Sequence, residues 1–92
     1  MREAMRQEDL IVSIKRAVTD GRREEVLAAT RSVLAEGMSP REVIEAALVP
    51  AIDEVGRMYV AEELFLPEMM ESAETFQAAM EAADEIGLAV IA

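Results

Sequence analysis

The sequence predicts an all-α protein, an antiparallel four-helix bundle, and three observations favour this class. Hydrophobic residues make up 52% of the 92 residues but aromatic residues only 3%, which suits the narrow aliphatic stripes of helices. Apolar residues recur with the 3.6-residue period of a helix in four segments, and glycine or proline separates these segments. A chain of this length forms one small domain, so residues 1–92 are expected to fold as a single helical domain.

The first two helices are expected over residues 8–20 and 23–35. Gly21 and Gly37 follow their last periodic residues, where a helix commonly ends in a left-handed residue. The apolar faces are expected at Leu10, Ile11, Ile14, Ala17 and Val18 in the first helix and at Val26, Leu27, Thr30, Val33 and Leu34 in the second.

The third helix is expected to begin with a capping box. Ser39 stands at the N-cap, Pro40 at the first helical position and Glu42 at the third, so that the side chains at both ends of the box can bond the free backbone N–H groups. Apolar residues then continue through Pro50 to Tyr59 without a change of register. Pro50 is therefore expected to kink this helix and not to end it.

A connection is expected within residues 60–66, after which Pro67 opens a fourth helix. Glu68 and Glu71 lie in its first turn, where negative charge is favourable against the helix dipole. Four amphipathic helices joined by short links are typical of an antiparallel bundle. The apolar positions of the fourth helix are expected to be Met69, Met70, Ala73, Phe76, Met80, Ala83 and Val90.

The composition excludes several classes of function. Without His or Cys the chain has no disulfide, no ordinary zinc site and no His-based catalysis. A net charge of −10 is repelled by phosphate backbones and anionic lipids, so no nucleic acid and no membrane is expected as a partner. No apolar run is long enough for a membrane span and the N-terminus lacks the hydrophobic segment of a signal peptide, so a cytoplasmic protein is expected.

Carboxylates are the remaining candidates for chemistry, and they cluster around the start of the fourth helix. These residues alternate with the apolar stripe and have no His beside them, so solvated surface is the favoured interpretation and no metal site is expected. No nucleophile stands beside a base, so no catalytic residue is expected and the chain is not interpreted as an enzyme by itself. The carboxylates concerned are Glu62, Glu63, Glu68, Glu71 and Glu74.

The most unusual segment is residues 56–70, called the elbow below, which holds the only Tyr, one of two Phe and three of seven Met. Two interpretations are open. The large apolar side chains plug the end of the bundle, which spacing alone favours, or part of the cluster faces outward as a lid over a flat apolar ligand or a partner. The side chains in question are Tyr59, Leu64, Phe65 and Leu66.

The order and spacing of several short motifs resemble the helical domain that precedes the cobalamin-binding domain of corrinoid proteins. This family includes cobalamin-dependent methionine synthase and the methyl carriers that serve methanol and methylamine methyltransferases. The resemblance covers nearly the whole chain and culminates in the spacing Tyr59-x6-Leu66-Pro67-Glu68. The other motifs that carry it are Asp20-Gly21, Glu36-Gly37-Met38-Ser39-Pro40, Leu48-Val49-Pro50-Ala51-Ile52, Val55-Gly56 and Ser72-Ala73-Glu74.

The resemblance implies a four-helix bundle that caps the upper, methyl-bearing face of the corrin. It implies that Tyr59 corresponds to the aromatic residue that leans on the methyl group, and Leu66 to the leucine seven residues later. Met69 corresponds to the apolar residue three positions beyond. These three are the expected cofactor-binding residues, and a dry apolar cover suits a weak cobalt–carbon bond that must be shielded until transfer.

Two departures from the family pattern concern the elbow. Tyr59 replaces the usual Phe and brings a hydroxyl that needs a partner or water if it is buried. Val60 and Glu62 stand where the family often has Gly, which implies a stiffer connection or a longer third helix.

A third departure concerns the cofactor itself. The family holds cobalamin through an α/β domain with the motif Asp-x-His-x-x-Gly, and this chain has no His. Cobalamin is therefore expected only together with such a domain, C-terminal to residue 92 in a longer protein.

The expected function is that of a non-catalytic cap domain in a corrinoid methyl carrier, within a cobalamin-dependent methyltransferase system. Its expected partners are its own C-terminal cobalamin-binding domain and a substrate-specific methyltransferase. The alternative is a bundle that acts only through protein–protein contact or as a homodimer, through the elbow or the apolar tail 86–92. A light-sensing cobalamin-dependent regulator is disfavoured, because the Trp and His that such bundles place near the corrin are absent.

Overall fold

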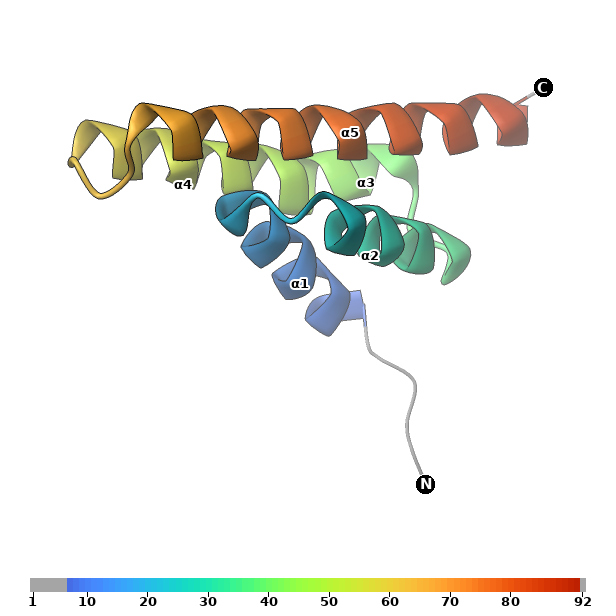
Figure 1. Cartoon of the computed structure of the whole chain (residues 1–92). Coiled ribbons are helices and arrows are strands. Elements are labelled where there is room, and N and C mark those ends of the chain that lie inside the picture. Colours follow the sequence, from blue (N-terminus) through green and yellow to red (C-terminus); the bar gives the residue numbers. More distant parts are fainter. Residues whose placement is uncertain (1–6, 92) are drawn as a thin grey trace.

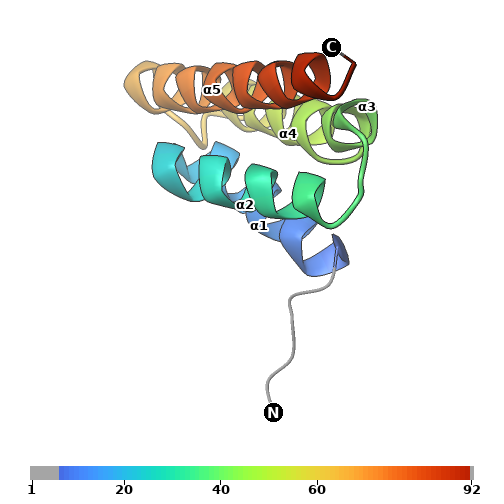
Figure 2. The same cartoon turned by 90° about the vertical axis from the view of Figure 1, so that its right-hand side faces the viewer.

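The computed structural model describes residues 7–91, with the side chains of residues 7–85. Within that range the chain is helical and forms two layers (Figures 1 and 2). The long α5 lies antiparallel beside the third helix in one layer, and the shorter pair α1 and α2 forms the other. The elements are α1 (Gln7–Asp20), α2 (Arg23–Ala35), α3 (Pro40–Val43), η1 (Ile44–Leu48), α4 (Val49–Val60) and α5 (Leu66–Ile91).

The four-helix bundle expected from the sequence is confirmed, since α3, η1 and α4 follow one another without a break and form one helix. The first two helices have nearly the expected bounds, and both end at the expected glycines. Gly21 has φ +70°, and the N–H groups of Gly21 and Arg22 donate to the carbonyls of Val18 (3.2 Å) and Ala17 (2.8 Å). This left-handed cap satisfies carbonyls that the end of the helix would leave free.

The third helix begins with the predicted capping box. The Glu42 N–H donates to Ser39 Oγ at 3.1 Å, and the Ser39 N–H donates to Glu42 Oε1 at 2.9 Å. Both bonds satisfy backbone donors that have no partner within the helix.

Pro50 distorts this helix without ending it, as expected, and the distortion is a single π-helical segment, η1, directly before it. The Val49 N–H donates to the carbonyl of Ile44, five residues back. Because proline lacks an N–H and its ring crowds the carbonyl four residues earlier, the wider π turn is a way to accommodate it inside a continuous helix.

The buried face of α5 differs from the sequence expectation. Met70 and Ala73 were expected in the core and are exposed, while Ser72 and Thr75 are buried. The face that packs against the other helices carries small side chains, which allow close approach, so the bulky residues of the stripe are left on its flank. Ala78, Ala79, Ala82 and Ala83 complete the buried face, whereas Met69, Phe76 and Met80 are half-buried. Val90 and the apolar tail 86–92 lie outside the residues whose side chains are described.

The C-terminal end of α1 is fastened to α5. The Ser72 hydroxyl is fully buried and donates to the carbonyl of Thr19 at 3.0 Å, one of the last carbonyls of α1. Next to it, a β-carbon at position 21 would lie only 3.2 Å from the β-carbon of Glu71. The two layers therefore approach closely at this point, immediately beside the base of the elbow.

Candidate functional site

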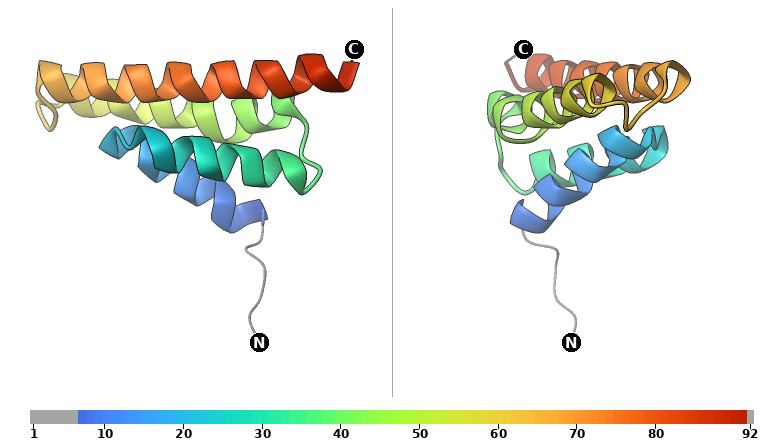
Figure 3. Two further views of the ribbon diagram at one scale, coloured as in Figure 1. Left: turned by 45° about the vertical axis from the view of Figure 1, so that its right-hand side comes forward. Right: turned by 90° about the vertical axis from the view of Figure 1, so that its left-hand side faces the viewer.

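The elbow lies at one end of the molecule and extends past the layer formed by α1 and α2 (Figure 3, left; Figure 1). At its tip the chain leaves α4 after Val60 and enters α5 at Leu66. Because no element of the other layer lies beneath the tip, the side chains there can remain in solvent.

The backbone of the elbow is held by hydrogen bonds. Glu62 has φ +65°, and the N–H groups of Glu62 and Glu63 donate to the carbonyls of Tyr59 (3.0 Å) and Met58 (2.8 Å). This is the same left-handed cap that ends α1, with Glu in the place of Gly. On the far side of the connection the Phe65 N–H donates to Glu68 Oε1 at 2.8 Å. The third helix thus ends at Val60 and is not extended, and the absence of Gly is accommodated by strain at Glu62.

This strain supports a prediction. Glu62→Gly is expected to raise the free energy of unfolding by about 1 kcal/mol, because Gly adopts a left-handed φ without the steric cost that an L side chain bears. Urea denaturation of the two proteins measures it. Glu63→Gly is the matched control, since it removes the same charge at a residue without positive φ, and it is expected to destabilise. A change of the same sign in the free energy of unfolding of both variants would contradict the strain at Glu62.

The large apolar side chains of the elbow are mostly exposed. Val60 is 81% exposed, Phe65 76%, Leu66 51% and Tyr59 40%. Only Leu64 turns inward, where it is half-buried against the core. The interpretation of these residues as a plug is therefore wrong for Phe65, Leu66 and Tyr59 and holds for Leu64 alone.

The structure brings two of the three predicted cofactor-binding residues together. Tyr59, near the end of α4, and Leu66, the first residue of α5, line one surface hollow. Met69 lies one turn into α5, is half-buried against the core and does not line that hollow. Leu66, Met70 and Ala73, spaced as on one helix face, continue the exposed apolar surface along α5. The remaining lining residues of the hollow are Val60, Glu62, Leu64 and Phe65.

Charged groups near the elbow offer no arrangement for acid–base chemistry. The hydrogen bond from Arg57 lowers the pKa of the exposed Glu54 carboxyl, and the same bond raises the pKa of Arg57 (Nε to Oε1, 3.1 Å). The five carboxylates that the sequence singled out are all exposed, as expected. Among residues 7–85, no group of acidic side chains is placed to hold a metal ion.

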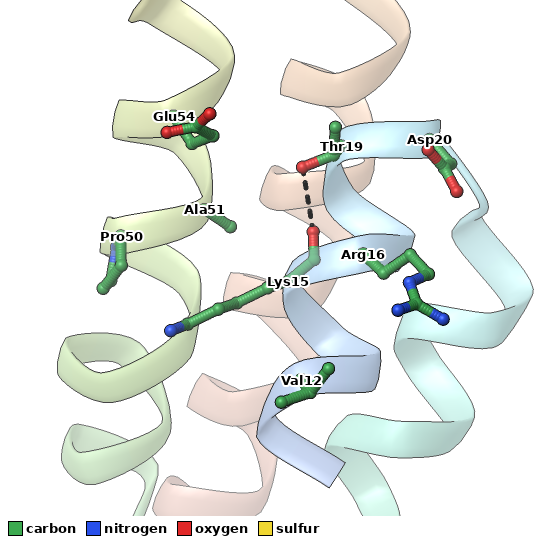
Figure 4. Close-up of a pocket in the computed structure, with 8 residues that line it drawn as sticks. All are labelled: Val12, Lys15, Arg16, Thr19, Asp20, Pro50, Ala51 and Glu54. Carbon is green, nitrogen blue, oxygen red and sulfur yellow. Dashed lines mark hydrogen bonds between the residues drawn. The ribbon is translucent and has the colours of Figure 1, made fainter. Parts of the chain in front are cut away.

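A second hollow lies between α1 and α4 (Figure 4). Lys15 extends across it from α1 toward the helix that carries Pro50, and both acidic and basic side chains surround it. The Thr19 hydroxyl donates to the Lys15 carbonyl within α1 at 3.0 Å. No pair of groups in this hollow is arranged for proton transfer, so the elbow is the stronger candidate. The other residues that line the hollow between α1 and α4 are Val12, Arg16, Asp20, Ala51 and Glu54.

Comparison with known proteins shows the family to which the chain belongs. A family model described as the B12 binding domain matches residues 10–83, which is most of the chain. The chain belongs to this family. The resemblance drawn from the sequence motifs, to the helical domain of corrinoid proteins, is thereby confirmed. Within the described helices, none combines the length and the apolar character needed to cross a membrane.

Curated relatives of the chain are trimethylamine and dimethylamine corrinoid proteins of Methanosarcina species. Trimethylamine corrinoid protein 1 of Methanosarcina acetivorans is 33% identical over 82% of the chain and 35% of its own length. Dimethylamine corrinoid protein 1 of the same organism is 33% identical over 89% of the chain and 38% of its own length. Trimethylamine corrinoid protein of Methanosarcina barkeri is 35% identical over 74% of the chain. The chain thus spans about a third of the length of these relatives.

Two features of the elbow region escaped sequence reasoning. The buried hydrogen bond from Ser72 to the Thr19 carbonyl joins residues 53 positions apart, and no local sequence pattern predicts such a contact. The exposure of Val60 and Phe65 depends on where the α1–α2 layer ends. The signals that were available were the unusual apolar density of the connection and the absence of Gly at Glu62.

Proposed function

We propose that this domain covers the upper, methyl-bearing face of cobalamin in a corrinoid methyl carrier, as part of a methyltransferase system. The observation that carries the proposal is the pair Tyr59 and Leu66, two exposed apolar residues from different helices that line one hollow. Membership in the B12 binding domain family and the similarity to methylamine corrinoid proteins support it.

The residues fit a cover and do not fit a cobalt ligand. The hollow is lined mainly by apolar side chains, which exclude water, and its one charged lining residue is Glu62. The chain contains no His, so in this proposal a separate α/β domain of the same protein would supply the cobalt ligand. When bound, the corrinoid would carry the methyl group. Tyr59, Leu66 and the neighbouring Met69 shield it from water between transfers.

The cover has to give way when a methyl group is transferred, because a methyltransferase and an acceptor must reach the same face. An apolar, exposed surface suits such reversible contact. No ion pair at the hollow has to be broken, and the side chains are held on the ordered ends of two helices.

The test is photolysis of methylcobalamin in the corrinoid protein that contains this domain. Tyr59→Ala and Leu66→Ala are each expected to speed the loss of methylcobalamin absorbance under constant illumination several-fold, because each opens the cover. The free energy of unfolding is expected to change by less than about 1 kcal/mol, since both side chains are largely outside the core.

The matched control is Val12→Ala, which removes a similarly exposed apolar side chain from α1, outside the elbow. It is expected to leave photolysis unchanged. Unchanged photolysis in the Tyr59 and Leu66 variants, with a clear loss of stability, would instead show that both side chains serve only the packing of the bundle end.

A further inference from the structure

Ser72 is the first buried residue of α5, and the elbow lies directly before it. Between Val55 on α4 and Ser72 on α5 no residue is buried, because residues 56–71 are all exposed or half-buried. The elbow, which carries the proposed cover, is therefore held between these two anchors. The interactions that hold Val55 and Ser72 in place also determine where the cover lies.

The two anchors are of different kinds. Val55 is an aliphatic residue of the hydrophobic core, where contacts have no preferred direction. Ser72 instead donates a hydrogen bond from its fully buried hydroxyl to the carbonyl of Thr19, at 3.0 Å. A hydrogen bond weakens steeply when its angle departs from linearity, and a buried hydroxyl without a partner is costly. This bond therefore favours one position of α5 against α1.

The Thr19 carbonyl can accept this bond because α1 ends there. The left-handed cap at Gly21 uses two earlier carbonyls, and the carbonyl of Thr19 accepts from the Ser72 hydroxyl. Beside this bond, a β-carbon at position 21 would lie only 3.2 Å from the β-carbon of Glu71. The bond thus joins two backbones at the point where they approach so closely that a glycine is needed.

The distance from this anchor to the cover is short. Met69 stands one helical turn before Ser72, and Leu66 stands six residues before it, about 9 Å along the axis. Because α5 is a continuous helix from Leu66 onward, a displacement at Ser72 also moves its first turns. Tyr59 lies on the other helix, α4, so the hollow that Tyr59 and Leu66 share changes shape when the start of α5 moves.

We propose that Ser72 is a positioning residue for the cofactor cover. Its hydrogen bond to Thr19 holds the first two turns of α5, and with them Leu66 and Met69, in the place that closes the cover over the corrin. The inference rests on the proposed function, under which these side chains shield the cofactor. Ser72 does not line the hollow itself, so it acts through the residues that do.

The first test is photolysis of methylcobalamin in the corrinoid-loaded protein that contains this domain. Ser72→Ala is expected to speed the loss of methylcobalamin absorbance about twofold or more, because a site that loses a supporting contact becomes loose. The double variant of Ser72→Ala and Leu66→Ala is expected to lose it no faster than Leu66→Ala alone, since both changes open the same cover. Effects that multiply in the double variant would overturn the action of Ser72 through Leu66.

Two controls separate position from stability. Thr75→Val removes the other buried hydroxyl of this helix face, which donates to the Glu71 carbonyl within α5 and not to another helix. Val33→Ala truncates a fully buried core residue near the end of α2 that lies away from the elbow (Figure 1), and it is expected to lower Tm at least as much as Ser72→Ala. Both controls are expected to leave photolysis unchanged. An equal acceleration in either control would overturn the positioning role.

A second readout needs no corrinoid. The Met69 N–H donates to the Phe65 carbonyl at 3.0 Å, in the first turn of α5. In the corrinoid-free protein, amide hydrogen exchange at Met69 and Met70 is expected to be faster in Ser72→Ala than in the parent, with exchange in α2 unchanged. Equal exchange at these two amides in variant and parent would show that Ser72 does not hold the start of α5.

The variants of the cover separate this inference from the proposed function. If Tyr59→Ala and Leu66→Ala speed photolysis and Ser72→Ala does not, the cover stands and the positioning role is overturned. If none of the three speeds photolysis, the proposed function fails and the positioning role fails with it. Faster photolysis in all three, with both controls unchanged, supports both.

Discussion

Gly21→Ala is expected to destabilise the domain by about 2–3 kcal/mol, the sum of a left-handed backbone that L residues avoid and a tight new contact. Gly21 has φ +70°, and a β-carbon there would lie 3.2 Å from the β-carbon of Glu71. Because each kcal/mol lowers Tm of a domain of this size by about 4–8 °C, thermal unfolding followed by circular dichroism measures the effect readily.

Gly56→Ala makes the same chemical change in the interior of α4 and is expected to have the opposite sign. A β-carbon at Gly56 meets no atom within 4 Å, and its φ does not lie in the left-handed region. Ala is favoured over Gly in a helix interior by roughly 0.5–1 kcal/mol. If both variants lost or gained stability together, the left-handed cap and the approach of Glu71 would not be the cause.

Leu48→Ala is expected to cost about 2–5 kcal/mol, which is the usual range for a fully buried leucine. Leu48 is completely buried and stands at the end of the π segment, where it packs into the core shared by the two layers. Truncation leaves a cavity that the surrounding helices can fill only in part. Urea denaturation is the appropriate measurement, with the slope m expected to stay the same.

Val49→Ala, one residue further, is the control for Leu48→Ala. Val49 is 42% exposed, so its truncation is expected to change the free energy of unfolding by less than about 1 kcal/mol. An equal loss in both variants would mean that the π segment itself, and not the buried leucine, limits stability. The contrast also serves the function, because Leu48 holds the bundle together whereas Tyr59 and Leu66 are proposed to cover the cofactor.

The positions of the helices could be predicted from the sequence with little error. The capping box at Ser39 and Glu42, the left-handed glycines and the register that passes through Pro50 are local signals, each decided by residues within one or two turns. Such interactions do not depend on which other helix lies nearby, so a pattern of adjacent residues is sufficient to predict them.

The buried face of α5 could not be predicted in the same way. Its apolar residues form a stripe wider than the surface that other helices cover, so periodicity alone could not decide which edge is buried. Ser72 and Thr75 are buried because the hydroxyl of each finds a carbonyl, Thr19 across the layers and Glu71 one turn back. Met70 and Ala73 are exposed on the opposite flank.

The sequence predicted which residues belong to the candidate site, but it did not predict which of them are exposed or which line the same hollow. Motif spacing identified Tyr59, Leu66 and Met69, and the structure places the first two at one hollow and the third one turn away, against the core. Their proposed contact with the corrin stays a prediction. Only the structure shows that Val60 and Phe65 line the same hollow and are the most exposed of its large apolar side chains.

By itself, the sequence determined the helical class, the ends of the helices and the family, because these follow from local hydrogen bonding, hydrophobic period and motif spacing. Only the tertiary structure decided which apolar residues remain in water. The α1–α2 layer is shorter than the α4–α5 pair, so it ends before the elbow and leaves Tyr59, Val60, Phe65 and Leu66 uncovered. The exposure of an apolar side chain depends on what lies beneath it, and that depends on residues far away along the chain.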